Sequence, residues 1–394
     1  MLASVRTILD DIRAEGWDAL VRHASAIDNA PPELLYVAPF AATARRELPA
    51  EAQAAMRLAV DQIRTFHQLS LPEAVEVETQ PGLSVAKLWR PIDRAGLYVP
   101  GGRAPLFSTL MMLAIPARVA GVGELVVVTP PRAGGGLDPA IALAAEMCGI
   151  DAIRTVGGAQ AIAALAYGAG DIPAVDRICG PGNAWVSAAK AMVSSDTGGP
   201  GIDLPAGPSE LMVLCGSGGE PTTIAADLLS QAEHDLDAQV LVVSPDAALL
   251  DAVGLQVAQQ LAALTGEFAP VRAIRCADLD EALAIANAYA PEHLSLACGE
   301  TAARAEDVRS AGALFVGACA AESFGDYLAG PSHVLPTDGA ARFTGGVSTL
   351  TFMKAMSVQR ISAATAARLA APAAALARLE GLEAHARAAE ARAA

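Results

Sequence analysis

The stretch IRTVGGAQAIAALAYGAGDIPAVDRICGPGNAWVSAAKAMV, residues 153–193, alternates short β-branched runs with alanine-rich runs. Runs of the first kind favour strands and runs of the second kind favour helices. Together with the residues just before it, the stretch predicts strands at 125–128, 153–156 and 175–179 and helices at 139–148, 159–167 and 183–193. Strands that alternate with helices are typical of βαβ units on a parallel sheet.

A second alternating series follows further along the chain. It predicts strands at 211–215, 240–243, 271–275, 294–297 and 314–316, and helices at 223–233, 247–264 and 279–288. Two such series predict an α/β protein with two doubly wound domains. Helical segments are expected at both ends, up to about residue 75, with breaks at the prolines 31, 32 and 49, and again from about residue 346.

The composition limits the kinds of protein that this chain can be. Its 394 residues can fill more than one hydrophobic core, and 53% hydrophobic residues with 4% aromatics indicate helices packed closely on sheets. The formal net charge of −16 argues against nucleic-acid or anionic-membrane binding and suits a cationic small substrate. We therefore expect the partners to be small molecules or further copies of the chain.

Cysteines and apolar runs predict the cellular location. The six cysteines lie in apolar stretches without a C-x-x-C pair, so we expect buried free thiols in a reducing compartment. No apolar run reaches membrane-spanning length before a proline or an arginine interrupts it. The sequence therefore predicts a cytoplasmic protein.

Four of the six histidines, His234, His293, His333 and His385, lie in the second half of the chain beside acidic or amide residues. Gln231 and His234 are three residues apart in a predicted helix and therefore share a helix face. In residues 325–333, glycines and a proline let the carboxylate of Asp326 and the imidazole of His333 converge. Imidazoles with oxygen ligands suit zinc, or manganese or cobalt in its place. For any one of these histidines alone, a capping or core role remains the alternative.

Two loops between a predicted strand and a predicted helix are candidates for cofactor binding. They are Gly157-Gly158-Ala159-Gln160 and Gly180-Pro181-Gly182-Asn183, where free N–H groups at the helix start could bind a pyrophosphate. The sequence lacks a G-x-G-x-x-G after a strand, so a nucleotide would have to bind in another way. A tight turn that satisfies its own backbone is the alternative for both loops. Tyr98 could likewise be a buried structural residue.

Seven ordered motifs together resemble the histidinol dehydrogenase family, collinearly from about residue 85 to 337 and more loosely on to His385. In chain order they are Tyr98-Val99-Pro100-Gly101-Gly102, Gly157-Gly158-Ala159-Gln160-Ala161-Ile162-Ala163, Gly180-Pro181-Gly182-Asn183, Ala206-Gly207-Pro208-Ser209-Glu210, Ser230-Gln231-Ala232-Glu233-His234-Asp235, Ala290-Pro291-Glu292-His293, and Gly325-Asp326-Tyr327 with His333-Val334-Leu335-Pro336-Thr337. Because so many motifs occur in one order, the resemblance is specific.

The resemblance implies roles for particular residues. The zinc ligands would be Gln231, His234, Asp326 and His385, and Glu292 with His293 would be the acid/base pair. Ser209, His333 and Glu380 would contact the substrate, together with His293 and the metal ligands. Tyr98, Gln160 and Asn183 would contact NAD. From the residues alone, Glu292 and His293 could instead be a helix-end pair, Asp326 a turn residue, and Glu380 a solvated charge.

The resemblance also implies a fold and an assembly. The family fold is two incomplete Rossmann-like domains, in a homodimer whose subunits exchange a terminal arm and share active sites. On this chain the expected division is a helical segment at 1–24, a catalytic and metal-binding domain from 25–97 with 211–345, an NAD-binding domain at 98–210, and an exchanged tail at 346–394.

The implied reaction is oxidation of L-histidinol to L-histidine through a bound aldehyde, with two NAD and one zinc ion per subunit. Two alternatives remain open at this point. One is a related zinc- and NAD-dependent dehydrogenase that acts on another amino alcohol or a small diol at the same site. The other is a catalytically silent binding protein that keeps the fold.

Overall fold

The computed structural model describes residues 1–101, 105–204 and 207–393. Gly102 and Ala206, which belong to two of the motifs above, lie outside the described residues. The chain divides into two compact units: residues 1–70 with 92–352, and residues 71–91 with the segment from 353 onward. Among the described helices, none is both long and apolar enough to cross a membrane.

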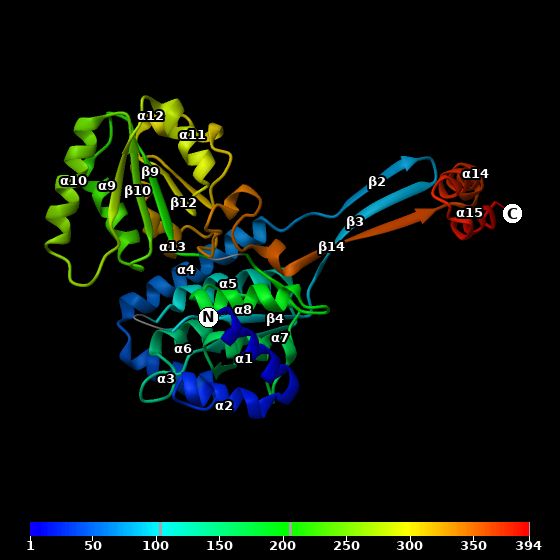
Figure 1. Cartoon of the computed structure of the whole chain (residues 1–394), viewed down its shortest axis with the longest axis horizontal. Coiled ribbons are helices and arrows are strands. Elements are labelled where there is room, and N and C mark those ends of the chain that lie inside the picture. Colours follow the sequence, from blue (N-terminus) through cyan, green and yellow to red (C-terminus); the bar gives the residue numbers. More distant parts are fainter. Residues whose placement is uncertain (102–104, 205–206, 394) are drawn as a thin grey trace. The chain divides into compact units, whose positions relative to one another are not determined.

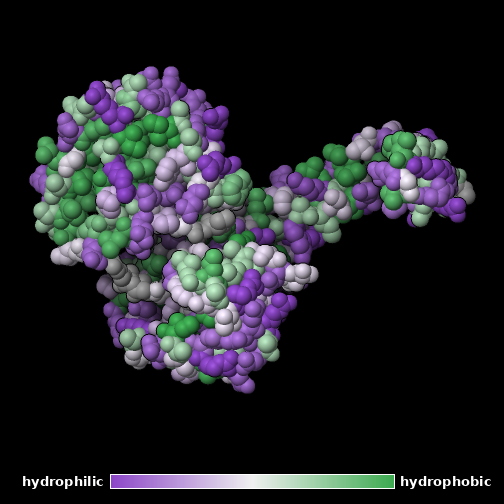
Figure 2. All heavy atoms as spheres, in the orientation of Figure 1, coloured by the Kyte–Doolittle hydropathy of each residue, from purple (hydrophilic) through white to green (hydrophobic). Residues whose placement is uncertain are grey.

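The smaller unit joins a hairpin to the end of the chain (Figure 1). Strands β2 (Val75–Gln80), β3 (Leu83–Pro91) and β14 (Met353–Ile361) form an antiparallel sheet in the order β14-β3-β2. Helices α14 (Ala363–Leu379) and α15 (Glu383–Glu390) pack on each other, and Arg378 of the first forms ion pairs with Glu383 and Glu390 of the second. Figure 2 shows hydrophobic residues on the surface of this unit, over both its strands and its helices.

The first sheet of the larger unit has six strands in the order β1-β6-β5-β4-β7-β8. Their bounds are β1 (Glu33–Tyr36), β4 (Arg94–Tyr98), β5 (Glu124–Thr129), β6 (Ala152–Thr155), β7 (Arg177–Cys179) and β8 (Gly201–Ile202). Strand β1 is antiparallel to β6, and the other five are parallel. Their order is third, second, first, fourth and fifth along the chain, which matches five of the six positions of the Rossmann arrangement.

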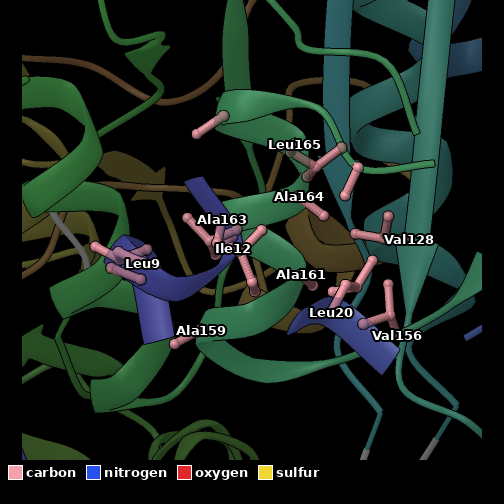
Figure 3. Packing of buried hydrophobic residues seen from close by; sticks show 14 of the residues in the cluster. Leu9, Ile12, Leu20, Val128, Val156, Ala159, Ala161, Ala163, Ala164 and Leu165 are labelled. Atoms are coloured by element: carbon pink, nitrogen blue, oxygen red, sulfur yellow. The ribbon is translucent and has the colours of Figure 1, made fainter. Parts of the chain in front are cut away.

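Helices cover both faces of this sheet. Helices α1 (Leu2–Glu15), α2 (Trp17–Ile27), α7 (Gly158–Tyr167) and α8 (Ala184–Ser195) share a core with Val126 and Val128 of β5, part of which Figure 3 shows. Val127, which alternates with those valines and points to the other face, is also fully buried. Helices α3 (Val37–Glu47), α4 (Ala50–Leu69), α5 (Phe107–Ala120) and α6 (Pro139–Met147) form a connected group, in which α5 contacts β4.

The second sheet of the larger unit has five parallel strands in the order β11-β10-β9-β12-β13, the same arrangement again. Their bounds are β9 (Glu210–Leu214), β10 (Gln239–Ser244), β11 (Val271–Arg275), β12 (His293–Leu296) and β13 (Ala313–Val316). Alternate residues of β9 enter two cores, Leu211 with α9 (Pro221–Ala232) and α10 (Ala247–Leu261), and Met212 with α11 (Leu279–Tyr289). This sheet is therefore doubly wound, as Figure 1 shows. The unit also contains two short α-helices, α12 (Gly299–Ala302) and α13 (Glu322–Tyr327), and three short 3₁₀ helices, η1 (Ala305–Asp307), η2 (Ala340–Arg342) and η3 (Thr349–Phe352).

The α/β class and the two Rossmann-like sheets are confirmed, and four details differ from expectation. Residues 353–361 form strand β14 instead of the helix predicted there, because they pair with β3 along nine residues. Residues 33–36, in the predicted helical start, form β1. Strands β1 and β4, expected with 211–345, instead pair within the sheet of residues 98–210. Cys319 is exposed, whereas the other five cysteines are buried.

Candidate active site

A cavity of about 180 Å³ lies where loops of the first sheet meet the starts of strands of the second. From the first sheet come Gly180, which follows β7, and Leu204, which follows β8. From the second sheet come Ser209, just before β9, and Glu292 and His293 at the start of β12. Gln231, His234, Asp326 and His333 also line the cavity. The structure therefore brings these sequence-predicted residues of the larger unit together.

His293 is buried, and the environment of its ring fixes its tautomer. Its Nδ1 lies 3.0 Å from the carbonyl oxygen of Glu210, which can only accept, so Nδ1 carries the proton. Burial lowers the pKa of His293 to about 4, which keeps the ring neutral at neutral pH. Nε2, 4.0 Å from Oδ1 of Asp326, is then left with a free lone pair. This arrangement suits a general base.

Glu292 is held by a reciprocal pair of hydrogen bonds with Glu210. The backbone N–H of Glu210 donates to Oε2 of Glu292 at 2.9 Å, and the backbone N–H of Glu292 donates to Oε2 of Glu210 at 3.1 Å. Burial raises the pKa of Glu292 well above its usual range, and the nearby carboxylates of Glu210 and Asp326 add to this effect. Once ionised, Glu292 is therefore a stronger base than an exposed carboxylate.

Two further buried carboxyl groups surround the pair and were not predicted from the sequence. Glu210 is 3% exposed and belongs to the Ala206–Glu210 motif, of which only Ser209 was given a role. Glu322, also 3% exposed, lies with Oε1 3.6 Å from Nδ1 of His293. Burial raises the pKa of Glu322 well above its usual range. In the sequence, nothing around Glu322 distinguishes it from a solvated acidic residue.

The side chain of Gln231 has the features of a group that binds a metal ion or a substrate. Its side chain is fully buried in the last turn of α9, and neither its amide oxygen nor its amide nitrogen has a hydrogen-bond partner among the described residues. A buried unpaired amide costs about 1–3 kcal/mol, so such a group usually meets a ligand or an ion. His234, two residues beyond α9, and Asp326, in α13, share the cavity with it.

The described residues do not contain a cluster of three or more His, Cys, Asp or Glu side chains that could hold a metal ion. Two members of the expected set, His234 and Asp326, and the amide of Gln231 lie in the larger unit. The remaining member, His385, is exposed on α15 of the smaller unit, and Glu380, also exposed, follows α14 there. The larger unit therefore contains three of the four expected zinc ligands, and the fourth lies in the smaller unit.

His333 is oriented by two hydrogen bonds. Its Nδ1 donates to the carbonyl oxygen of Asp326 at 2.9 Å, and its Nε2 lies 3.4 Å from Oγ1 of Thr109 in α5. Burial lowers the pKa of His333. The ring of His333 therefore links α5, which packs on the first sheet, to α13 at the wall of the cavity.

The three residues expected to contact NAD lie at the carboxyl ends of strands in the first sheet. The hydroxyl of Tyr98, the last residue of β4, accepts from the N–H of Gly158, and burial raises its pKa. Gln160 donates through Nε2 to Asp28 at 3.1 Å, and its Oε1 has no partner among the described residues. Asn183 follows β7 and caps α8 by accepting from two backbone N–H groups.

An ion pair that the sequence did not reveal supports the loop after β7. Lys190 and Asp203 are 3% and 1% exposed and form a close ion pair. Lys190 also donates to the carbonyl of Gly180 at 3.0 Å, while Asp203 accepts from the N–H of Gly180 at 2.7 Å. Gly180 has φ +128°, and a Cβ there would lie 2.0 Å from the carbonyl oxygen of Tyr98, so glycine is required.

Comparison with known proteins places the chain in a family. The family model of histidinol dehydrogenase matches residues 1–393. Histidinol dehydrogenases of Xanthomonas euvesicatoria pv. vesicatoria and Legionella pneumophila (strain Lens) are 46% and 43% identical, over 98% and 99% of this chain and 91% and 92% of theirs. The crystal structure of histidinol dehydrogenase from Elizabethkingia anophelis has a TM-score of 0.93 at 36% identity, over 99% of this chain and 91% of that one. This chain belongs to the histidinol dehydrogenase family.

Proposed function

We propose that this protein oxidises L-histidinol to L-histidine at the cavity between the two sheets, in two successive NAD-dependent steps. The observation that carries the proposal is the state of His293, a buried neutral imidazole whose Nδ1 is bonded to a carbonyl and whose Nε2 is free. A base of this kind can take a hydroxyl proton in each step and return it to solvent between steps.

In the first step, His293 accepts the hydroxyl proton of the alcohol through Nε2. The O–H and C–H bonds break, and the C–O bond becomes the carbonyl of an aldehyde. NAD, when bound, takes the hydride that each oxidation releases. Tyr98, Gln160 and Asn183 would hold it; this assignment is supported by their positions near the carboxyl ends of strands of the first sheet, where ligands of Rossmann-like sheets bind.

In the second step, Glu292 accepts a proton from the water that adds to the aldehyde. Because Glu292 keeps that proton, the adduct is the anion of the hydrate, with one hydroxyl and one ionised oxygen. The proton of its hydroxyl again passes to Nε2 of His293 as the remaining C–H bond breaks and the hydride leaves. The product is a carboxylate. This division of roles rests on the fixed orientation of Glu292, whose Oε2 is occupied by the N–H of Glu210 and whose other oxygen is left for water.

The metal site is proposed from the unpaired amide of Gln231. Gln231, His234 and Asp326 would hold a zinc ion together with His385, which the smaller unit of the other subunit would supply. When bound, zinc would fix the imidazole and amino nitrogens of the substrate. Ser209 and His333, at the cavity wall, and Glu380 would contact the same substrate.

We also propose a homodimer in which each tail completes the partner's site. The smaller unit exposes Val75 and Val77 on its hairpin and Leu376 and Leu379 at the end of α14. Helices with such exposed apolar side chains rarely persist without a partner. Mixing decides this arrangement. A subunit carrying His293→Asn and a subunit carrying His385→Asn, each inactive alone, should regain activity as a heterodimer that has one intact site. A mixture that stays inactive despite proven subunit exchange contradicts the proposal.

The proposed reaction is tested by stoichiometry. Purified protein, supplied with zinc, NAD and limiting L-histidinol, should form two NADH per L-histidinol and release L-histidine. Other amino alcohols at the same concentration serve as controls for the substrate. Zinc-replete protein that forms no NADH with L-histidinol, or that prefers another amino alcohol, would overturn the proposed substrate.

A further inference from the structure

Glu210 connects the acid/base residues Glu292 and His293 to strand β9 of the second sheet. It is the first residue of β9, and β12, which begins at His293, pairs with β9 in parallel. Its side chain is 3% exposed and, unlike that of Ser209 beside it, does not line the cavity. A carboxyl group buried in this way costs free energy unless its oxygens are hydrogen-bonded.

The main chain of Glu210 holds one atom of each acid/base residue. Its carbonyl oxygen accepts from Nδ1 of His293 at 3.0 Å, and its N–H donates to Oε2 of Glu292 at 2.9 Å. The first contact sets the tautomer and the plane of the imidazole. The second leaves one carboxyl oxygen of Glu292 for a water molecule. A displacement of this single peptide segment therefore disturbs both groups at once.

The side chain of Glu210 holds that segment in place. Oε2 accepts from the N–H of Glu292 at 3.1 Å, and Oε1 accepts from the N–H of Asp338 at 3.1 Å. Burial raises the pKa of this carboxyl group, and the side chain of Tyr289, at the end of α11, lowers it. Both oxygens accept from backbone donors, so only a carboxylate can satisfy both. An amide would turn an NH₂ group against one of the two N–H groups.

We infer that Glu210 is a positioning residue for the oxidation, one that aligns Glu292 and His293 without touching the substrate. This inference rests on the function proposed above. A residue with this role affects the rate of the chemical steps, because a displacement of about 1 Å in a reacting group can lower a rate about 10²-fold. It leaves substrate binding nearly unchanged.

The test compares Glu210→Gln with Thr301→Val. Thr301 bonds to the carbonyls of Leu214 and Cys298, at the opposite ends of the same two strands, so its variant loosens the strand pair away from the acid/base residues. Glu210→Gln should lower kcat by about 10²-fold, with the KM for L-histidinol within about twofold of the parent. Thr301→Val should lower the melting temperature but keep the parent kcat.

A second variant covers the case in which Glu210→Gln does not fold. Glu210→Asp keeps a carboxylate but shortens the side chain by one methylene, so that it cannot reach the N–H groups of both Glu292 and Asp338. It should lower kcat severalfold, with KM unchanged. A parent kcat in either folded variant overturns the inference, as does a kcat loss in Thr301→Val equal to theirs. Parent protein without L-histidinol-dependent NADH formation would instead count against the proposed function.

Discussion

The five parallel strands of each sheet in the larger unit have the same order, but the two sheets contribute opposite ends to the cavity. The first sheet contributes loops that follow its strands, including Gly180 and Leu204, whereas the second contributes residues at the starts of its strands, including Glu292 and His293. Ligands of open α/β sheets usually bind at the carboxyl ends of the strands. The first sheet follows this rule and the second departs from it. The strand order alone therefore does not predict where the reaction takes place; the side chains determine the site.

The largest effect is expected at the amino ends of the second sheet. Glu292→Gln should slow the oxidation of supplied aldehyde by at least about 10²-fold, because the water that adds to the aldehyde loses its base. Oxidation of the alcohol to the aldehyde should change far less. Single-turnover measurements that start from the alcohol and from the aldehyde separate the two steps. Parent-rate oxidation of the aldehyde by this variant would show that Glu292 does not activate water.

The next effect concerns the metal. His234→Asn should weaken zinc binding by at least about tenfold, while the fold survives, because the site has few protein ligands. Metal analysis after dialysis against a defined free zinc concentration measures the loss, and circular dichroism checks the fold. His23→Asn is a control, because His23 instead pairs with Asp11 near the start of the chain. Equal zinc content in the His234 variant and the parent would contradict the ligand assignment.

A smaller and different effect is expected at the first sheet. Lys190→Met leaves Asp203 buried without its partner, at a cost of about 3–5 kcal/mol. The loop at Gly180 loses its anchor, so the KM for NAD should rise more than the KM for L-histidinol. The double variant Lys190→Met with Asp203→Leu should recover stability but not the KM for NAD, since replacing Asp203 removes the acceptor of the Gly180 N–H as well. Unchanged KM values in both variants would exclude this anchoring role.

The sequence predicted the scaffold well because hydrophobic periodicity is local. The series around residues 211–316 became the five strands of the second sheet, and the series around residues 125–193 became β5, β6 and β7 of the first, with only small shifts at their ends. Strands β2, β3 and β8 were not predicted, and β1 and β14 fell in segments predicted to be helical, because their pairing is remote. Residues 33–36 lie against β6, and residues 353–361 against β3. Short or weakly β-branched segments acquire strand structure from such partners rather than from their own propensity.

Site residues were predictable only where a motif named them. Gln231, His234, Asp326 and His333 do converge on one cavity, although nothing in their spacing alone requires it. Glu210, Glu322, Lys190 and Asp203 were missed because burial, which gives them their importance, depends on tertiary packing. A charged residue in a sequence looks the same whether it is solvated or enclosed.

The smallest expected effect leaves activity at pH 7 unchanged. His67 of α4 is fully buried, both ring nitrogens lack partners among the described residues, and burial lowers its pKa to about 4. Because protonation then favours the unfolded chain, stability is complete above about pH 6.5 and is lost as the pH falls toward 4. Between pH 7 and pH 5 the contribution of His67 to the free energy of unfolding should fall by about 2 kcal/mol. Urea unfolding of His67→Leu should lack this component; an identical pH dependence would contradict it.

The division of labour between the two sheets is tested most directly by measuring NAD affinity and kcat in two variants side by side. His293→Asn, in the second sheet, should bind NAD with the parent Kd and lose about 10³-fold in kcat. Gln160→Met, in the first sheet, should bind NAD about tenfold more weakly, the equivalent of about 1.4 kcal/mol, and keep kcat within about twofold at saturating NAD. If the His293 variant loses NAD binding, or the Gln160 variant loses kcat but binds NAD normally, the account is wrong.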